Sequence, residues 1–257
     1  MLVPAELAAW GYAKCSGSMV HAPGRSMAPP DRIAGTTGIL YCAGRRGSVD
    51  QSFYRWVLRN SGVRVEPLGG HRDVLRQLQR KASDVDVPVT GVVDRDGWPD
   101  HILAKQSGIV EVLPYFEVES YLVHPELLGA ALGHRGAEVG ASHMMEVLLQ
   151  AARACYMPAI NAHLSHAPKS RGAGRLEQMA AQYASQLERA DAIIERGNAE
   201  ALLRYFPGRQ LSQRVARKLD FLSAQHLLDT IMQVPGLREH CRPILDLRGA
   251  LLLRLGL

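Results

Sequence analysis

The residues with the clearest chemical potential lie in the stretch GVVDRDGW, residues 91–98. Asp94 and Asp96 stand two positions apart where an apolar run meets a turn, so on an extended backbone their side chains project to the same face. Two carboxylates this close repel each other unless a cation neutralises them, and such oxygen ligands suit Mg²⁺ or Mn²⁺. A lone Asp-x-Asp more often only stabilises a turn, so the motif needs support from elsewhere in the chain.

Further carboxylates follow two other apolar runs. Asp50 falls in the first turn of a helix that Ser48 can cap, after a glycine-containing turn. Glu117 and Glu119 follow another apolar run, with Glu119 at the start of a helix or in the turn before it. A helix N-terminus favours an acidic residue, which explains each of them taken alone. Together with the Asp-x-Asp pair they suit one or two divalent ions for phosphodiester hydrolysis, where one ion activates water and the other stabilises the leaving oxygen.

Alternating strands and helices must position these carboxylates. The pattern predicts strands within residues 38–44, 63–70 and 87–98, helices within 48–62, 71–84 and 101–108, and a strand leading into a helix over 109–123. Strands that alternate with helices predict an α/β fold with a parallel sheet flanked by helices. The working groups of such sheets collect at the carboxyl ends of the strands, where the predicted metal ligands stand.

The rest of the chain divides by composition. Residues 1–36 are rich in Gly, Pro, Ser and Ala and predict a loosely ordered arm. Residues 37–135 carry the alternating pattern, and strand signals vanish over residues 136–257, which predicts an all-helical second domain. Within it, residues 174–206 read as one long helix or two, broken near Gly197.

Length, composition and net charge limit the class of protein. The chain has 257 residues, of which 47% are hydrophobic, enough for a substantial core. The net charge of +5 and the pI of about 9.2 are compatible with nucleic acid without demonstrating it. The four cysteines form no CxxC pair, which favours a reducing cytoplasm over a zinc or disulfide framework. We expect neither a transmembrane span nor a signal peptide.

The order of these features resembles the Toprim domain, which occurs in topoisomerases, primases, RNA-maturing nucleases and the OLD-type nucleases of phage defence. Residues 37–130 carry the resemblance, in the words SVDQSFYRWVL, PLGG, GVVDRDGW and LPYFEVESYLVHPELL. They are most similar to the stand-alone Toprim-like nucleases that work beside OLD-type ABC ATPases, such as the effectors of PARIS anti-phage systems. In the helical half only FPGRQLSQRV shares the similarity.

The resemblance gives position 43 a meaning. Toprim proteins normally carry a catalytic or metal-binding glutamate directly before the turn glycine, and here Ala43 stands before Gly44. Ala43 therefore occupies the place of the expected catalytic residue, beside Asp94, Asp96 and Glu119. The chain is either a natural pseudo-enzyme or a nuclease disarmed by a substitution. We favour the second explanation, because a site long free of selection should have lost more than one carboxylate.

Basic residues near the predicted site could contact phosphates, although solvated surface charge explains such residues equally well. Arg45 and Arg46 follow the first turn, and His71 begins a helix at the same edge of the sheet. The helical half supplies further candidates, of which one could stabilise developing charge near the metals: Lys169, Arg171, Arg175, Arg209, Arg214, Arg217 and Lys218.

These expectations combine into a metal-dependent endonuclease that uses Mg²⁺ or Mn²⁺, with Asp50, Asp94, Asp96 and Glu119 as ligands. The resemblance implies a tRNA-cleaving toxin effector of anti-phage defence, held inactive by an ABC-type ATPase partner and dimeric when released. One alternative is a non-catalytic Toprim-fold interaction subunit. Another is a housekeeping RNA-maturing nuclease, against which the long helical half argues.

Overall fold

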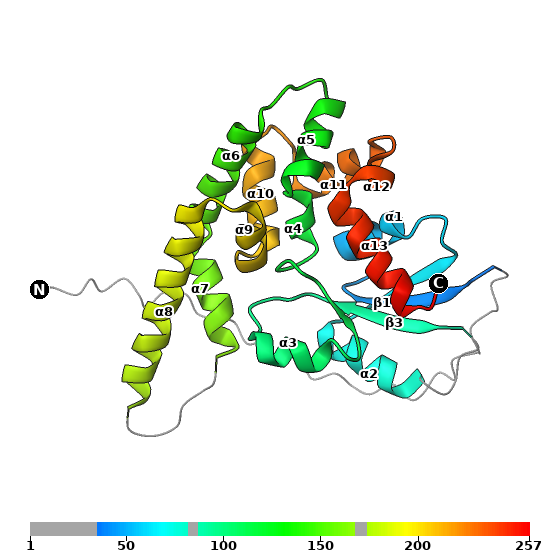
Figure 1. Ribbon diagram of the computed structural model, residues 1–257, viewed down its shortest axis with the longest axis horizontal. Coiled ribbons are helices and arrows are strands. Elements are labelled where there is room, and N and C mark those ends of the chain that lie inside the picture. The colour runs from blue at the N-terminus through cyan, green and yellow to red at the C-terminus, as the bar shows by residue number, and fades with distance from the viewer. Residues whose placement is uncertain (1–34, 82–86, 168–173) are drawn as a thin grey trace, which may run out of the picture. The chain divides into compact units, whose positions relative to one another are not determined.

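The sheet that the alternating pattern predicts is present in the computed structural model, which describes residues 35–81, 87–167 and 174–257. Four parallel strands stand in the order β2-β1-β3-β4, within Val63–Leu68, Gly38–Ala43, Val89–Val93 and Glu111–Val112 respectively. The carboxyl ends of all four strands therefore lie at one edge (Figure 1). This confirms the expected α/β class with a parallel sheet, while the predicted N-terminal arm lies almost wholly outside the described residues.

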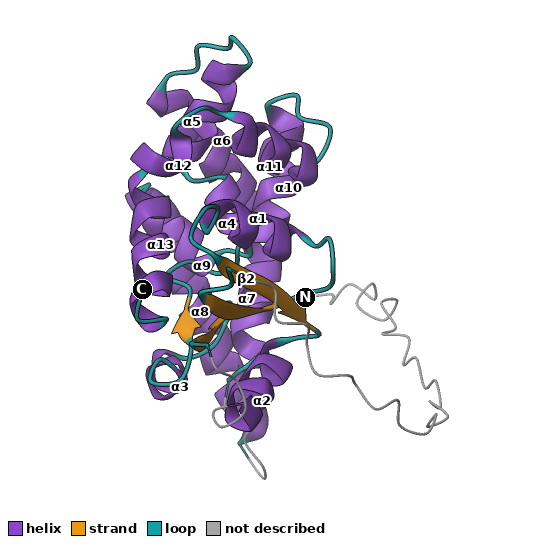
Figure 2. Cartoon of the chain, turned by 90° about the vertical axis from the view of Figure 1, so that its right-hand side faces the viewer, coloured by secondary structure: helices purple, strands orange, loops and turns teal. Residues whose placement is uncertain are grey.

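The central strand β1 is buried on both faces, as its continuous apolar sequence requires. Its alternate residues separate into two cores, because successive side chains of a strand point to opposite faces. Leu40 and Cys42 pack in the larger core with helix α1 (Val49–Val57), while Ile39 and Tyr41 pack with helix α2 (His71–Lys81). Figures 1 and 2 accordingly show α1 and α2 on opposite faces of the sheet.

Helices make up the rest of the described chain. After β4 the described residues contain no further strand, which confirms the predicted helical region. Gly197, at a φ of +58°, ends α8, so the long pattern forms two helices as one of its interpretations predicted. The helices not yet named are α3 (Asp100–Gln106), α4 (Glu119–Leu122), α5 (Pro125–His134), α6 (Ala141–Ala154), α7 (Tyr156–Ser165), α8 (Arg175–Arg196), α9 (Ala199–Tyr205), α10 (Gly208–Lys218), α11 (Ala224–Gln233), α12 (Leu237–His240) and α13 (Arg242–Arg254).

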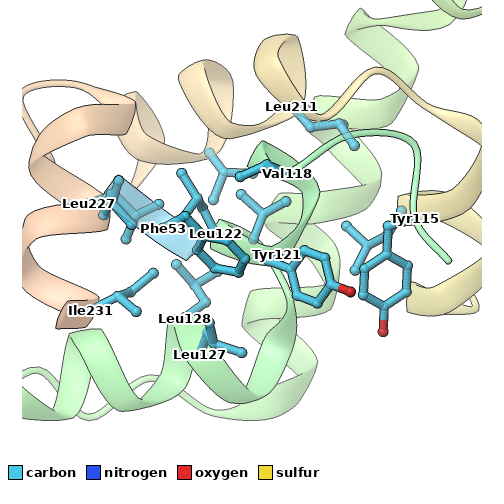
Figure 3. Close-up of a cluster of buried hydrophobic side chains, with 14 of the residues drawn as sticks. Phe53, Tyr115, Val118, Tyr121, Leu122, Leu127, Leu128, Leu211, Leu227 and Ile231 are labelled. Carbon is cyan, nitrogen blue, oxygen red and sulfur yellow. The ribbon is translucent and has the colours of Figure 1, made fainter. Parts of the chain in front are cut away.

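The short helix α4 lies at the centre of the larger core. Tyr121 of α4 packs against Phe53 of α1, with ring centroids 5.2 Å apart, and Leu227 of α11 joins the same cluster (Figure 3). Helices from both sides of residue 135 thus share one core, and residues 34–257 form one compact unit. The predicted domain boundary at residue 135 stays a prediction.

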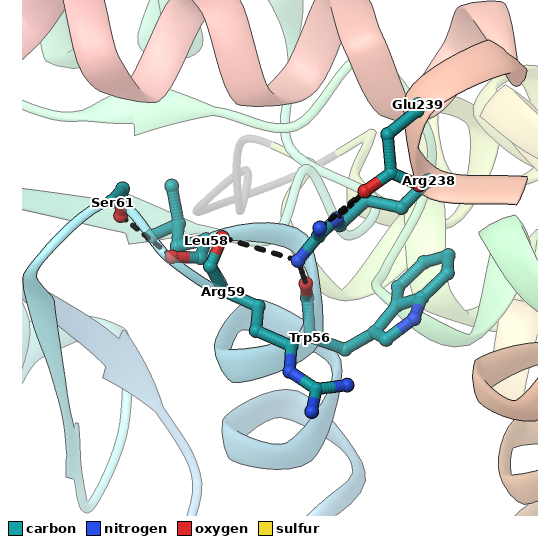
Figure 4. A network of polar contacts seen from close by, with 6 residues as sticks. All are labelled: Trp56, Leu58, Arg59, Ser61, Arg238 and Glu239. Carbon is teal, nitrogen blue, oxygen red and sulfur yellow. Dashed lines mark hydrogen bonds and ion pairs between the residues drawn. The ribbon is translucent and has the colours of Figure 1, made fainter. Parts of the chain in front are cut away.

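The end of the chain also returns to the sheet. Leu255, just after α13, reaches Gly38 at the start of β1, and Arg254 pairs with Glu111 of β4 at 2.5 Å. On α12, Arg238 donates to the carbonyl oxygens of Trp56 and Arg59 at 3.5 and 3.1 Å, at the end of α1 (Figure 4). These contacts connect the helical region to the sheet that carries the candidate site.

Candidate functional site

The turn after β1 delivers the first carboxylate to the edge of the sheet. Gly44 has a φ of +104°, which only glycine adopts freely. A Cβ on Gly44 would lie 2.6 Å from Ser48 Oγ and 3.0 Å from Asp50 Oδ2, so the Asp50 carboxyl sits directly behind the strand end. The Ser48 hydroxyl accepts the backbone N–H of Gln51 at 3.3 Å and caps α1, as the sequence predicts.

The end of β3 delivers the Asp-x-Asp pair. Asp96 has a φ of +48°, and its backbone N–H donates to the carbonyl oxygen of Phe116 at 2.7 Å. The next residue, Gly97, packs so closely on α7 that a Cβ there would lie 2.6 Å from the Ala162 carbonyl oxygen. The turn is therefore held from two sides. Strand β1 pairs with β3 through Tyr41 and Gly91, and continuing this register places Ala43 beside the residue that precedes Asp94.

The segment after β4 brings two glutamates and an arginine to the same edge. Glu119 at the start of α4 is only 5% exposed. The first turn of α10 lies against it: the Arg209 backbone N–H donates to Glu117 Oε1 at 2.7 Å, and the Arg209 Nε donates to Glu119 Oε1 at 3.2 Å. This close approach needs a glycine, because a Cβ on Gly208 would lie 2.4 Å from the backbone nitrogen of Ser120.

The electrostatics show that these carboxylates form one cluster. Burial, and then Asp50, Asp96, Glu117 and Glu119, raise the pKa of Asp94 well above its usual value. Burial also raises the pKa of Asp96 to about 6 and that of Glu117 to about 7, with Glu119 adding to both. The pKa of Asp50 rises for the same two reasons. Negative charge at this edge is therefore under-compensated, although Arg209 offsets part of it.

The donor chemistry fits a hard divalent cation, since every member of the cluster offers carboxylate oxygens. The side chains do not form a complete metal site as they stand. Among the described residues, no three His, Cys, Asp or Glu side chains are grouped as ligands of one ion. Glu119 is instead engaged by Arg209. To hold Mg²⁺ or Mn²⁺, the side chains of Asp94, Asp96 and their neighbours would have to rotate towards a common point.

The basic residues that were predicted to contact phosphates lie in different places in the structure. Arg209 reaches the carboxylates, and Arg45 and Arg46 lie exposed in the turn after β1. Lys218 lies nine residues beyond Arg209 on α10, roughly 13 Å along the helix axis, where it donates to Gln150 Oε1 at 2.7 Å. Lys169 and Arg171 fall outside the described residues.

The sequence interpretation missed a basic cavity that is lined in part by Arg95, the residue between Asp94 and Asp96. It has a volume of about 550 Å³, and its lining includes Arg95, Arg189, Arg196 and Arg204. Asp100 pairs with Arg95 and, at 3.6 Å, with Arg204, so the other two arginines have no carboxylate partner among the described residues. Arg189 and Arg196 stand seven positions apart, which puts them on one face of α8 and is the one signal that the sequence offered.

Comparison with known proteins adds no family: no protein-family model, no curated protein and no solved structure matches this chain. Across the described residues, no helix is both long and apolar enough to cross a membrane.

Proposed function

We propose that the native protein is a metal-dependent nuclease built on a Toprim-like domain. The observation that carries the proposal is the gathering of carboxylates from the segments after β1, β3 and β4 at one edge of a parallel sheet. Burial first, and neighbouring carboxylates second, raise the pKa values of Asp50, Asp94 and Glu117. Such clusters serve a catalytic purpose more readily than a structural one, because ordinary stability does not gain from buried like charges.

In this proposal Asp94 and Asp96 hold Mg²⁺ or Mn²⁺, and Asp50 and Glu119 complete the site. The ion would polarise the phosphodiester and lower the pKa of a bound water. Arg209 and the arginines of the basic cavity would hold the backbone of the substrate. A glutamate in place of Ala43 would act as general acid or base, so the chain as it stands should be inactive or severely impaired.

The biological setting rests on the resemblance alone. It implies a toxin effector of anti-phage defence in the cytoplasm, with tRNA as substrate, an ABC-type ATPase that restrains it, and a homodimer after release. The chain contains no Walker A motif, so any ATP dependence would come from that partner.

One observation favours a second candidate, a non-catalytic docking module. Ala43 offers no chemistry at the strand end, and the ion pair of Arg209 with Glu119 already supplies a counter-charge without any metal. In this alternative the fold persists as a binding surface and the carboxylates have no catalytic task.

A cleavage assay separates the two candidates. The parent chain, Ala43→Glu and the neutral isostere Ala43→Gln are incubated with total tRNA or plasmid DNA, with Mg²⁺, Mn²⁺ or a chelator. We expect cleavage by Ala43→Glu alone, only with metal, and its loss when Asp94→Asn is added. Equal inactivity of all three proteins would support the docking module, and equal activity would remove residue 43 from the mechanism.

A further inference from the structure

A second cavity, of about 530 Å³, opens at the same edge of the sheet beside the carboxylate cluster. Its lining includes His71 at the start of α2, Trp98 just before α3, Gln106 at the end of α3, and His166 after α7. Asp96 also lines it, so the cavity and the candidate metal ligands share a wall. A ligand that places a phosphate at the carboxylates would therefore extend its neighbouring groups into this cavity.

The cavity presents aromatic surface. Trp98 lies 4.1 Å from His166 and 5.8 Å from His71, measured between ring centroids, with tilts of 32° and 47°. Burial lowers the pKa of both histidines, which favours the neutral imidazole. Flat, uncharged rings of this kind stack on nucleobases without demanding a particular sequence.

The wall of the cavity also contains polar atoms without a well-formed hydrogen bond. Both ring nitrogens of His71 and the Oε1 of Gln106 are buried without a hydrogen bond. Gln106 lies near enough to His71 to raise its pKa, but the pair does not reach hydrogen-bond geometry. Leaving such atoms unpaired is costly, and a neutral imidazole and an amide match the mixed donors and acceptors of a base edge.

We propose that this cavity receives one unpaired base of a nucleic-acid substrate, stacked on Trp98 and hydrogen-bonded by His71 and Gln106. The inference rests on the proposed nuclease function and narrows its substrate to strands with an unpaired or extruded nucleotide beside the cleaved phosphate. A base inside a duplex cannot enter such a cavity without leaving its stack.

The test measures binding with the parent chain, which keeps Ala43 and should not cut its ligand. Labelled oligonucleotides in ribose and deoxyribose forms are offered as single strands, as perfect duplexes and as hairpins with an unpaired loop. We expect single strands and loops to bind about tenfold more tightly than duplexes, in one sugar form or in both. Equal affinity for duplex and single strand would overturn the proposal.

The residue that stacks is tested by substitution together with abasic ligands. Trp98→Ala should weaken binding of single strands about tenfold, whereas Trp98→Phe keeps most of the affinity because an aromatic face remains. An oligonucleotide made entirely of abasic sites should bind parent and Trp98→Ala alike, since the base that Trp98 stacks is already missing. An equal loss from Trp98→Ala with normal and abasic strands would show a merely structural role and refute the stacking role.

The two proposals can fail separately. If single strands bind through Trp98 but Ala43→Glu never cuts nucleic acid, the base cavity stands and the nuclease fails. If Ala43→Glu cuts and its rate is unchanged by Trp98→Ala, the nuclease stands and the base cavity fails. Thermal unfolding of each variant confirms that it is folded, and the conservative Trp98→Phe keeps the comparison valid if Trp98→Ala unfolds.

Discussion

Without divalent metal, the carboxylate cluster should make the protein less stable as the pH rises through the acidic range. Folding raises the pKa of Asp96 from 3.8 to about 6 and that of Glu117 from 4.5 to about 7. Between the unfolded and the folded pKa, the folded state holds a proton that the unfolded state has released. The contribution of these two carboxyl groups to the free energy of unfolding is therefore fully present below about pH 4 and is lost progressively up to about pH 7.

The size of the effect follows from Asp96 alone. A rise in its pKa from 3.8 to about 6 corresponds to roughly 3 kcal/mol of folding free energy lost over that range. In a unit of this size, 1 kcal/mol shifts the melting temperature by about 2–4 °C, so the expected change is roughly 6–12 °C. The contribution of Glu117 does not simply add to it, because Glu119 raises both pKa values.

Asp96→Asn isolates this contribution, because asparagine tolerates the positive φ of Asp96 and carries no charge. Melting temperatures are measured in a chelator at about pH 4 and about pH 7, with Asp246→Asn as a control at an exposed carboxylate. We expect Asp96→Asn to exceed the parent at about pH 7 and to match it closely at about pH 4, while the control follows the parent at both.

Adding Mg²⁺ extends the same assay to the metal. Millimolar Mg²⁺ should raise the melting temperature of the parent at about pH 7. A hundredfold excess of Mg²⁺ over its Kd corresponds to about 2.7 kcal/mol of added stability. The melting temperature of Asp96→Asn should rise less. If Asp96→Asn melts with the parent at both pH values, neither burial nor the neighbouring Glu119 raises the pKa of Asp96 in the folded protein. If only the Mg²⁺ effect is missing, the electrostatic account stands and the metal site falls.

The contacts that hold the site give two further predictions for thermal or chemical unfolding. Gly208→Ala should cost about 1–3 kcal/mol, because its Cβ would collide with the backbone of Ser120, whereas Gly249→Ala inside α13 meets nothing within 4 Å and should stabilise by up to about 1 kcal/mol. Equal effects would show that α10 does not press on α4. Arg238→Ala should cost about 1–2 kcal/mol by removing two hydrogen bonds from a charged guanidinium to the end of α1, and an unchanged unfolding midpoint would contradict this.

The sheet and its carboxylates were predictable because their signals are local. Continuous apolar runs identify β1 and β3 as strands buried on both faces, and parallel strands send their carboxyl ends to one edge. Asp94 then follows from its position directly after β3, and Asp50 and Glu119 from their positions in the first turns of the helices that follow β1 and β4. The break at Gly197 was predictable for a similar reason, since a glycine in the left-handed region ends a helix.

Tertiary contacts explain what the sequence left open. Arg209 was one candidate among several basic residues, and only the approach of α10 to α4 through Gly208 selects it. The basic cavity joins Arg95 from the turn after β3 with residues more than ninety positions away. Trp98 showed no role in its own segment, because its partners His71 and His166 belong to distant elements.

The charge environment of residue 43 can be measured without any substrate. The register places Ala43 beside the residue before Asp94, so a glutamate there would add one more carboxylate to a cluster that already resists ionisation. Arg209 is already engaged with Glu119, which leaves protonation or a divalent cation to neutralise the added charge. Ala43→Glu should therefore melt below the parent in a chelator at about pH 7 and gain more from Mg²⁺, while Ala43→Gln should do neither. Identical Mg²⁺ responses in all three proteins would place residue 43 outside the cluster and leave the loss of a catalytic carboxylate without structural support.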